Sequence, residues 1–201
     1  MKITKNIFLI CALFSSLSLM ANGYEVGDYT SDFKLKNVDG KMVSLSDYED
    51  ARGFILIFTC NTCPYAQKYE QRIIELHEKF SQQGFPVIAI NPNDPGKSSG
   101  DAFDLMKARA KEKDFPFPYL QDQDQTIAQK YGATRTPEVY LLAKHDDKFK
   151  LIYTGAIDDN YSDASKVSTR YIAEAINQYT AGKEVKEKAT KAIGCTIKWK
   201  S

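Results

Sequence analysis

The sequence predicts one α/β domain built on a mixed β-sheet flanked by helices. Phe54–Phe58 is a short apolar run, as a buried strand would be, and Pro64–Phe80 carries apolar residues at helical spacing. A second apolar run follows at Phe85–Ile90, so the three segments form a β-α-β unit with parallel strands. Farther along, Glu138–Ala143 and Phe149–Gly155 flank a polar turn, which predicts an antiparallel hairpin. Parallel and antiparallel pairs together make the predicted sheet mixed.

The remaining elements surround this core. The segment before it, residues 24–50, contains short strand-like pieces around the turn "NVDG". Between and after the core strands we expect a helix over Asp101–Asp114, a short strand at Pro118–Leu120, a short helix over Gln125–Tyr131 and an amphipathic helix over Ser168–Tyr179. The predicted domain spans residues 24–182, with an N-terminal extension and an inserted helix. A Lys-rich C-terminal tail, residues 183–201, is expected to pack on it.

Composition limits the classes of function. The chain has 201 residues, 43% of them hydrophobic, which is enough for one substantial core. Its 27 Lys and Arg residues stand against 26 Asp and Glu residues, a formal charge of +1. Such a balance provides no overall attraction to nucleic acid or to an acidic membrane surface. We therefore expect no nucleic-acid partner, and the function must come from a local site.

Residues 1–23 have the pattern of a secretory signal peptide. Two lysines form a basic start, Ile7–Met20 is apolar, and Ala21 and Gly23 offer cleavage positions. The apolar stretch is shorter than the roughly 20 residues that a spanning helix needs. The pattern predicts a cleaved Sec-type signal and a periplasmic or otherwise exported protein, with no integral membrane segment after cleavage. An uncleaved N-terminal anchor is the alternative.

The cysteines carry the candidate chemistry. Cleavage removes Cys11 and leaves Cys60, Cys63 and Cys195, an odd number in a compartment where disulfides persist. The first two lie in "FTCNTCPYA", between the first core strand and the first helix. A helix N-terminus carries unpaired N–H groups and about half a positive charge, which stabilises a thiolate. We therefore expect a lowered pKa and the attacking role for Cys60, and the resolving role for Cys63.

Two other interpretations of the cysteine pair are open. A purely structural disulfide would stabilise the chain little, because the ring it closes is so small. For a metal site, two thiols do not complete a tetrahedral zinc centre, and His77 and His145 are expected at the surface. We expect neither a bound metal nor an organic cofactor.

The order of elements, with Cys-x-x-Cys where the first strand meets the first helix, resembles the thioredoxin fold. The added N-terminal segment and the inserted helix resemble the peroxiredoxin and thiol-disulfide reductase branch of that superfamily. More closely, the chain is similar to bacterial redoxin-domain proteins of the peroxiredoxin-like (AhpC/TSA-like) group. The similar segments are, in order, "FTCNTCPYA", "INPND", "FPYL", "YGATRTPEVYLL", "YTGAIDDNY" and "IGCTIKWK". The resemblance covers nearly all of the chain after the signal and implies redox chemistry without a defined substrate.

The thioredoxin resemblance implies a second half of the site. A cis-proline before the penultimate strand faces the cysteines in that fold, and the residue before it offers its backbone to a substrate chain. Thr136-Pro137 occupies this place, with an ordinary trans proline at a strand start as the alternative. Thioredoxins also have a Trp before the first cysteine and a buried acid on the preceding strand, where this chain has Thr59 and Phe54. Glu138 is a candidate substitute acid, with a surface carboxylate as its alternative role.

The peroxiredoxin resemblance implies an alternative activity. Peroxiredoxins carry a Thr three residues before the peroxidatic cysteine and a Pro farther upstream. Alignment of Cys63 with that cysteine places Cys60 at the Thr position and Leu56 at the Pro position, so the peroxide-activating arrangement is absent. Arg135 is a candidate for the peroxidase arginine, although it lacks its partners. Thiol peroxidase activity is therefore the alternative to disulfide exchange.

Cys195 has two interpretations. It is either a spare thiol in a packed tail or a second resolving thiol that the tail brings within reach of Cys60. The function that the sequence favours is an exported thiol-disulfide oxidoreductase with a Cys60–Cys63 couple. Its expected partners are protein or small-molecule disulfides and thiols, together with a redox partner that the sequence does not identify. The alternatives are a thiol peroxidase and a non-catalytic binding domain with a static disulfide.

Overall fold

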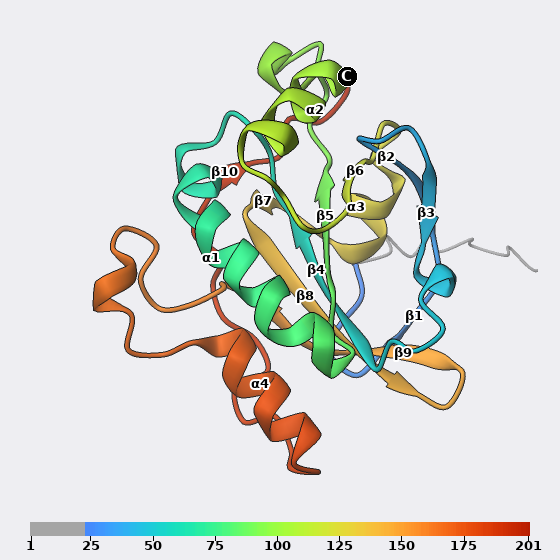
Figure 1. The fold of residues 1–201 in the computed structure, drawn as a ribbon, viewed down its shortest axis with the longest axis vertical. Coiled ribbons are helices and arrows are strands. Elements are labelled where there is room, and N and C mark those ends of the chain that lie inside the picture. Colours follow the sequence, from blue (N-terminus) through green and yellow to red (C-terminus); the bar gives the residue numbers. More distant parts are fainter. Residues whose placement is uncertain (1–22) are drawn as a thin grey trace, which may run out of the picture.

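The computed structural model describes residues 23–201, so the signal peptide predicted over residues 1–23 lies, except for Gly23, outside the described residues. Its centre is an eight-stranded sheet with the strand order β1-β9-β8-β4-β5-β6-β2-β3 (Figure 1). The strands of this sheet are β1 (Tyr29–Thr30), β2 (Lys34–Asn37), β3 (Met42–Ser44), β4 (Gly53–Phe58), β5 (Val87–Asn91), β6 (Tyr119–Gln121), β8 (Glu138–His145) and β9 (Lys148–Gly155). β4 pairs in parallel with β5, and β8 pairs antiparallel with both β4 and β9. The predicted β-α-β unit and hairpin are thereby confirmed.

Helices cover both faces of the sheet, as the predicted fold class requires. They are α1 (Pro64–Phe80), α2 (Phe103–Glu112), α3 (Thr126–Tyr131) and α4 (Tyr171–Thr180), with 3-10 turns at Leu45–Asp47, Ser81–Gln83, Ser99–Asp101 and Ala164–Lys166. Buried side chains of α1, α2 and α4 form one core with the sheet, and those of α3 form a second core on its other face. None of the described helices has the length and the apolar character needed to cross a membrane.

The central strand β4 decides where the site lies. All six of its residues are buried, and alternate side chains enter the two cores: Ile55 and Ile57 pack toward α1, while Leu56 and Phe58 pack toward α3. The strand ends at Phe58, and α1 begins at Pro64, which suits the first helical position because its missing N–H would have no partner there. The connection between them therefore stands at the carboxyl end of the strand.

Two predicted helices are shorter than expected at their start. The predicted final helix began at Ser168, but α4 begins at Tyr171, because the backbone N–H groups of Ser168 and Thr169 donate to the Asp159 carboxylate. The predicted inserted helix began at Asp101, which instead ends a 3-10 turn before α2. In both cases side-chain or turn hydrogen bonds at the start of the segment replace the first helical turn.

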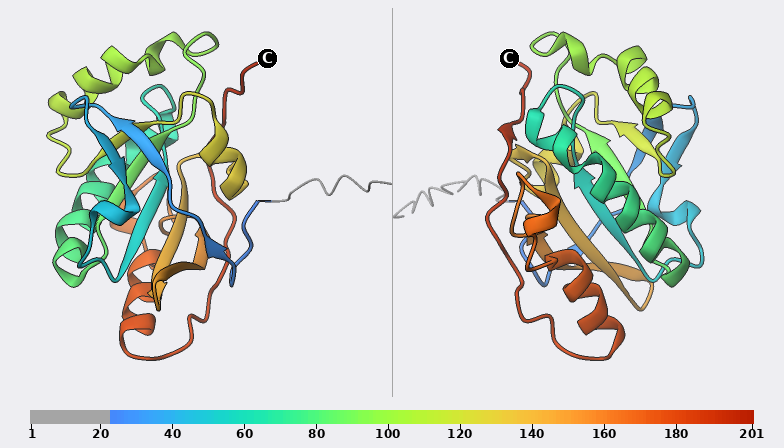
Figure 2. Two further views of the ribbon diagram at one scale, coloured as in Figure 1. Left: turned by 90° about the vertical axis from the view of Figure 1, so that its right-hand side faces the viewer. Right: turned by 60° about the vertical axis from the view of Figure 1, so that its left-hand side comes forward.

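The tail, residues 183–201, folds back along the domain (Figure 2). Its first part forms a bridge with the end of β9, where Thr154 pairs with Ala189. Farther on, β10 (Cys195–Thr196) pairs antiparallel with β7 (Arg135–Thr136) in a separate two-stranded sheet. The sequence did not predict β10, because a strand of two residues has no hydrophobic alternation that could reveal it. The tail thus crosses the molecule from the α4 end to the end that carries the cysteines.

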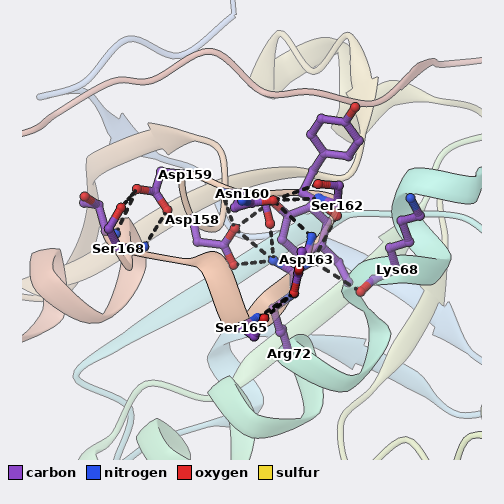
Figure 3. A network of polar contacts seen from close by, with 12 residues as sticks. Lys68, Arg72, Asp158, Asp159, Asn160, Ser162, Asp163, Ser165 and Ser168 are labelled. Carbon is purple, nitrogen blue, oxygen red and sulfur yellow. Dashed lines mark hydrogen bonds and ion pairs between the residues drawn. The ribbon is translucent and has the colours of Figure 1, made fainter.

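A polar network ties α1 to the loop after β9 (Figure 3). Arg72 Nη1 donates to both Asp158 carboxylate oxygens, at 2.9 and 2.7 Å, and to the Asn160 carbonyl oxygen at 2.7 Å. The Tyr69 hydroxyl donates to the same carboxylate at 2.9 Å. The side chains of Arg72 and Asp158 are only 12% and 4% exposed, so breaking the pair would leave a buried charge without its partner. The network holds α1, and with it the helix N-terminus, in a fixed position on the sheet.

Candidate active site

Cys60 and Cys63 lie in the connection between β4 and α1. Cys63 is the N-cap of α1 in extended conformation, and Cys60 stands three residues earlier, just beyond the end of β4. Their exposed fractions are 4% and 2%, and with Ala66 they form a small buried cluster that Cys195 also packs against. All three cysteines are free. The two cysteines of the motif are therefore close together but covered.

Thr136 contacts both cysteines of the motif. The Thr136–Pro137 peptide bond is cis, as expected. The hydroxyl oxygen of Thr136 lies 3.1 Å from Cys60 Sγ, and its carbonyl oxygen lies 3.1 Å from Cys63 Sγ. Thr136 is fully buried. The residue before the cis-proline thus borders the cysteine pair, as the thioredoxin resemblance implied, and its role toward a substrate stays a prediction.

The structure reverses the expected ionisation of the two cysteines. The neighbouring Cys60 thiol lowers the pKa of Cys63 to about 5, against the cost of burial, and the Cys195 thiol and the backbone N–H of Ala66 in the first turn of α1 add to this effect. The pKa of Cys60 is raised, because its thiol is the donor to Cys63, because it is buried, and because the Asp101 charge lies nearby. The expected lowering at Cys60 is therefore wrong. The helix starts at Pro64, so its unpaired N–H groups stabilise a thiolate at Cys63 instead.

A pH titration of the reduced protein tests this reversal. Because the pKa of Cys63 is lowered to about 5, its thiolate dominates above that pH, and the ultraviolet thiolate absorbance is expected to fall as the pH drops through about 5. The Cys63→Ser variant should lack this transition, whereas Lys191→Ala, a change at an exposed tail position, should keep it. A low-pH transition that survives in Cys63→Ser would contradict the assignment.

The tail brings the third cysteine to this pair. Thr136 pairs with Cys195 across the β7–β10 ladder, and the Cys195 thiol lies with its Sγ 2.6 Å from Cys63 Sγ. Arg135 Nη1 donates to the Gly194 carbonyl oxygen at 3.0 Å. The sequence allowed that the tail would bring Cys195 to Cys60, but the sulfur that it contacts is that of Cys63. Arg135, the candidate peroxidase arginine, thus contacts the tail, and its role toward a peroxide stays a prediction.

Sequence reasoning missed the residue that organises the connection between the cysteines. Asp101 is fully buried, and its carboxylate accepts hydrogen bonds from the Asn61 backbone N–H (2.7 Å), Thr62 Oγ1 (2.8 Å), Asn91 Nδ2 (3.2 Å), Asn93 Nδ2 (3.0 Å) and Ser98 Oγ (2.6 Å). Both residues between the cysteines are thus tied to one carboxylate. The sequence did contain a signal for this contact. Because β4 and β5 are parallel, the polar residues that follow β5 lie at the same sheet edge as the residues that follow β4.

The other candidate residues have structural partners. Glu138 Oε2 accepts from the backbone N–H groups of Thr134 and Arg135, at 2.8 and 3.0 Å, so it stabilises the turn before the cis-proline. His77 is half-buried, not at the surface as expected, and its Nδ1 accepts from the Val87 N–H at 3.2 Å. Within residues 23–201, no group of three or more His, Cys, Asp or Glu side chains is arranged to hold a metal ion.

Comparisons with known proteins agree with this geometry. A family model described as the AhpC/TSA family matches residues 26–153. The thiol-disulfide oxidoreductase ResA of Halalkalibacterium halodurans is 24% identical over 134 residues, which are 66% of this chain and 70% of that protein. The chloroplastic peroxiredoxin Q of Gentiana triflora is 28% identical over 106 residues, which are 53% of this chain and 45% of that protein. The similarity to curated relatives thus includes both disulfide exchange and peroxide enzymes.

Solved structures share the fold. An uncharacterized conserved protein from Geobacillus kaustophilus superimposes with a TM-score of 0.81 at 33% identity, over 89% of this chain and 94% of that chain. The exposed lipoprotein thioredoxin Etrx1 from Streptococcus pneumoniae gives a TM-score of 0.53 at 23% identity, over 65% of this chain and 93% of that chain. The first similarity extends over nearly the whole described chain, and the second confirms the thioredoxin-like fold. Together with the family match over most of the sheet, these findings show that the chain is a thioredoxin-fold redoxin protein and an oxidoreductase that belongs to the AhpC/TSA family.

Proposed function

We propose that the protein is an exported thiol-disulfide oxidoreductase whose redox couple is Cys60 and Cys63. The observation that carries the proposal is the buried cysteine pair at the N-terminus of α1, with Thr136 in contact with both sulfurs and the cis-proline beside it. A low-pKa thiolate next to a second thiol is the arrangement that disulfide exchange requires. The relatives named thiol-disulfide oxidoreductase support the same reaction class.

The ionisation of the pair assigns the two roles. In the reduced protein the Cys63 thiolate attacks one sulfur of a substrate disulfide, so that a Cys63–substrate bond forms and the other substrate sulfur leaves and takes a proton. Cys60 then gives up its proton and attacks Cys63 Sγ, which releases the second substrate thiol. The substrate gains two electrons, and the protein ends with a Cys60–Cys63 disulfide. The same steps in reverse would oxidise a dithiol.

A substrate chain is proposed to bind along β7. The backbone of Arg135 and Thr136 offers strand hydrogen bonds directly before the cis-proline, so an extended peptide could lie there by β-augmentation. Protein and small-molecule disulfides are therefore the proposed substrates, with residues 24–182 as the catalytic domain. Export is proposed from the pattern of residues 1–23 alone.

Peroxide reduction is the second candidate. It is favoured by the lowered pKa of Cys63 at a helix N-terminus and by the peroxiredoxin Q relatives. Against it, Cys60 stands where peroxiredoxins have their Thr, and Arg135 is bonded to the Gly194 carbonyl oxygen. The peroxide oxygen would therefore lack the activating donors, and disulfide exchange remains the proposal.

Turnover assays on the reduced protein separate the candidates. We expect reduction of insulin and glutathione disulfide that is lost in the Cys60→Ser/Cys63→Ser double variant, with hydrogen peroxide consumed slowly. Rapid peroxide consumption without disulfide turnover would replace the proposal by a peroxidase. Failure to react with either oxidant would indicate a non-catalytic binding domain.

A further inference from the structure

The tail strand β10 occupies the edge of β7 at which a substrate chain would pair. Cys195 is opposite Thr136 in the ladder, and the Ile197 N–H donates to the Thr134 carbonyl oxygen at 3.0 Å. Both motif cysteines are almost fully buried beneath this arrangement. The chain thus supplies its own extended segment to the surface beside the cis-proline, and that segment carries a cysteine at the position nearest to Cys63.

The close approach depends on a glycine. A Cβ atom on Gly194 would lie 2.2 Å from the Thr136 carbonyl oxygen, so any side chain at this position would push β10 away from β7. With glycine there, the Sγ atoms of Cys195 and Cys63 lie 2.6 Å apart, only about half an ångström farther than a disulfide bond. Disulfide exchange between them would need almost no movement of the backbone.

The tail is held on both sides of β10, so the position of Cys195 is set by more than one contact. Before it, the Thr190 N–H donates to the Thr154 carbonyl oxygen at 3.0 Å, at the end of β9. After it, the Lys198 N–H donates to Asn93 Oδ1 at 2.9 Å and the Asp94 N–H donates to the Lys198 carbonyl oxygen at 2.9 Å. Ile197 is buried in the core on the α3 side. Such anchoring gives Cys195 a high effective concentration at Cys63.

We propose that Cys195 is a third redox-active cysteine. It displaces Cys60 from Cys63, so that the Cys60–Cys63 disulfide is exchanged for a Cys63–Cys195 disulfide. The proposal rests on the proposed function. In this step Cys195 loses its proton and attacks Cys63 Sγ, the Cys63–Cys195 bond forms, the Cys60–Cys63 bond breaks, and Cys60 leaves and takes up a proton. No electrons are gained or lost overall, so the step needs no further oxidant.

Competition for β7 sets the order of the two resolving steps. A substrate chain paired with β7 excludes β10, so Cys195 is then displaced and Cys60, which lies under Thr136, resolves the mixed disulfide. When the reduced substrate leaves, β10 returns and Cys195 attacks Cys63. The Cys63–Cys195 bond thereby locks the tail over the site, and its reduction leaves β10 held by non-covalent contacts alone, as in this structure, so that a substrate chain can displace it.

Disulfide mapping after oxidation tests the proposal directly. The reduced protein is oxidised with diamide, quenched with acid at increasing times, and analysed by mass spectrometry under non-reducing conditions. We expect the Cys63–Cys195 bond to replace any Cys60–Cys63 bond in the wild-type protein as time proceeds, and the Cys60→Ser variant to form Cys63–Cys195 within one chain. A Cys60→Ser variant that keeps its two thiols, or joins them only between chains, would overturn the proposal.

A pair of tail variants tests the geometry without removing a sulfur. Gly194→Ala should slow the formation of Cys63–Cys195 about tenfold to a hundredfold relative to the formation of Cys60–Cys63, because it displaces β10. Ile193→Ala, which shortens an exposed neighbouring side chain, should behave as wild type. Equal rates in Gly194→Ala and Ile193→Ala would count against the proposed approach of Cys195.

These readouts are independent of turnover. If wild-type protein fails to reduce insulin and glutathione disulfide while Cys60→Ser still forms Cys63–Cys195, the proposed function fails and the cysteine contact is real. If turnover is normal and mapping finds only Cys60–Cys63, the role of Cys195 fails and the proposed function stands.

Discussion

Replacement of Cys63 by serine is expected to slow disulfide exchange by at least about a thousandfold, because it removes the thiolate that attacks the substrate. The pKa of Cys63 is lowered to about 5, so this sulfur is ionised at neutral pH while that of Cys60 keeps its proton. The measurement is the rate at which reduced variants react with glutathione disulfide, followed by mass spectrometry of the adduct.

The matched control keeps Cys63 and removes both thiols that could resolve it. The Cys60→Ser/Cys195→Ser variant should accumulate a stable mixed disulfide with glutathione at Cys63, since neither partner can release it. In Cys63→Ser, by contrast, an adduct should form only slowly. A Cys63→Ser variant that captures glutathione at Cys60 at the wild-type rate would restore the roles that the sequence suggested.

Replacement of Asp101 by asparagine is expected to lower the free energy of unfolding by about 3 kcal/mol. Oδ1 of Asp101 accepts from the Asn61 N–H and Asn91, and Oδ2 accepts from Thr62, Asn93 and Ser98. An amide has only one acceptor oxygen, so buried donors on one side would face an NH₂ group. Loss of the negative charge should also lower the pKa of Cys60, which that charge helps to raise.

Urea unfolding of the reduced protein checks this expectation. Asp104→Asn is the control, because that side chain is 91% exposed and lies three residues away on the same segment, and it should change the free energy of unfolding by less than about 0.5 kcal/mol. If Asp101→Asn unfolds at the same urea concentration as this control, the carboxylate does not hold the loop between the cysteines.

Much of the fold was predictable because its signals are local. The apolar run of β4 and the helical periodicity of α1 are properties of neighbouring residues, and both elements have the predicted position, with α1 matching to the residue. The cis-proline was accessible only through resemblance, since a proline before a strand is usually trans. Local pattern therefore predicted the elements, and resemblance predicted how two of them meet.

The parts of the site that escaped prediction depend on long-range contacts. Cys195 meets Cys63 across 132 positions of the chain, through a two-residue strand with no hydrophobic alternation of its own. Asp101 is a polar residue in a turn-rich loop, where most aspartates are exposed, and its burial follows from donors on two parallel connections. The lowered pKa was assigned to the wrong cysteine because it depends on which of the two cysteines is the N-cap residue, and that residue is Cys63.

The two disulfides that Cys63 can form close rings of very different size. A Cys60–Cys63 bond closes a ring of a few residues and hardly restricts the unfolded chain, whereas a Cys63–Cys195 bond joins positions 132 residues apart. In the chain-entropy treatment, a loop of that length removes enough disorder from the unfolded state to stabilise the folded one by about 5 kcal/mol. Transfer of one bond between neighbouring sulfurs would then change how firmly the whole protein resists unfolding, although no electron enters or leaves. The resting oxidised form would be the durable one, and each reduction would return the chain to a looser state in which its own C-terminus can be displaced.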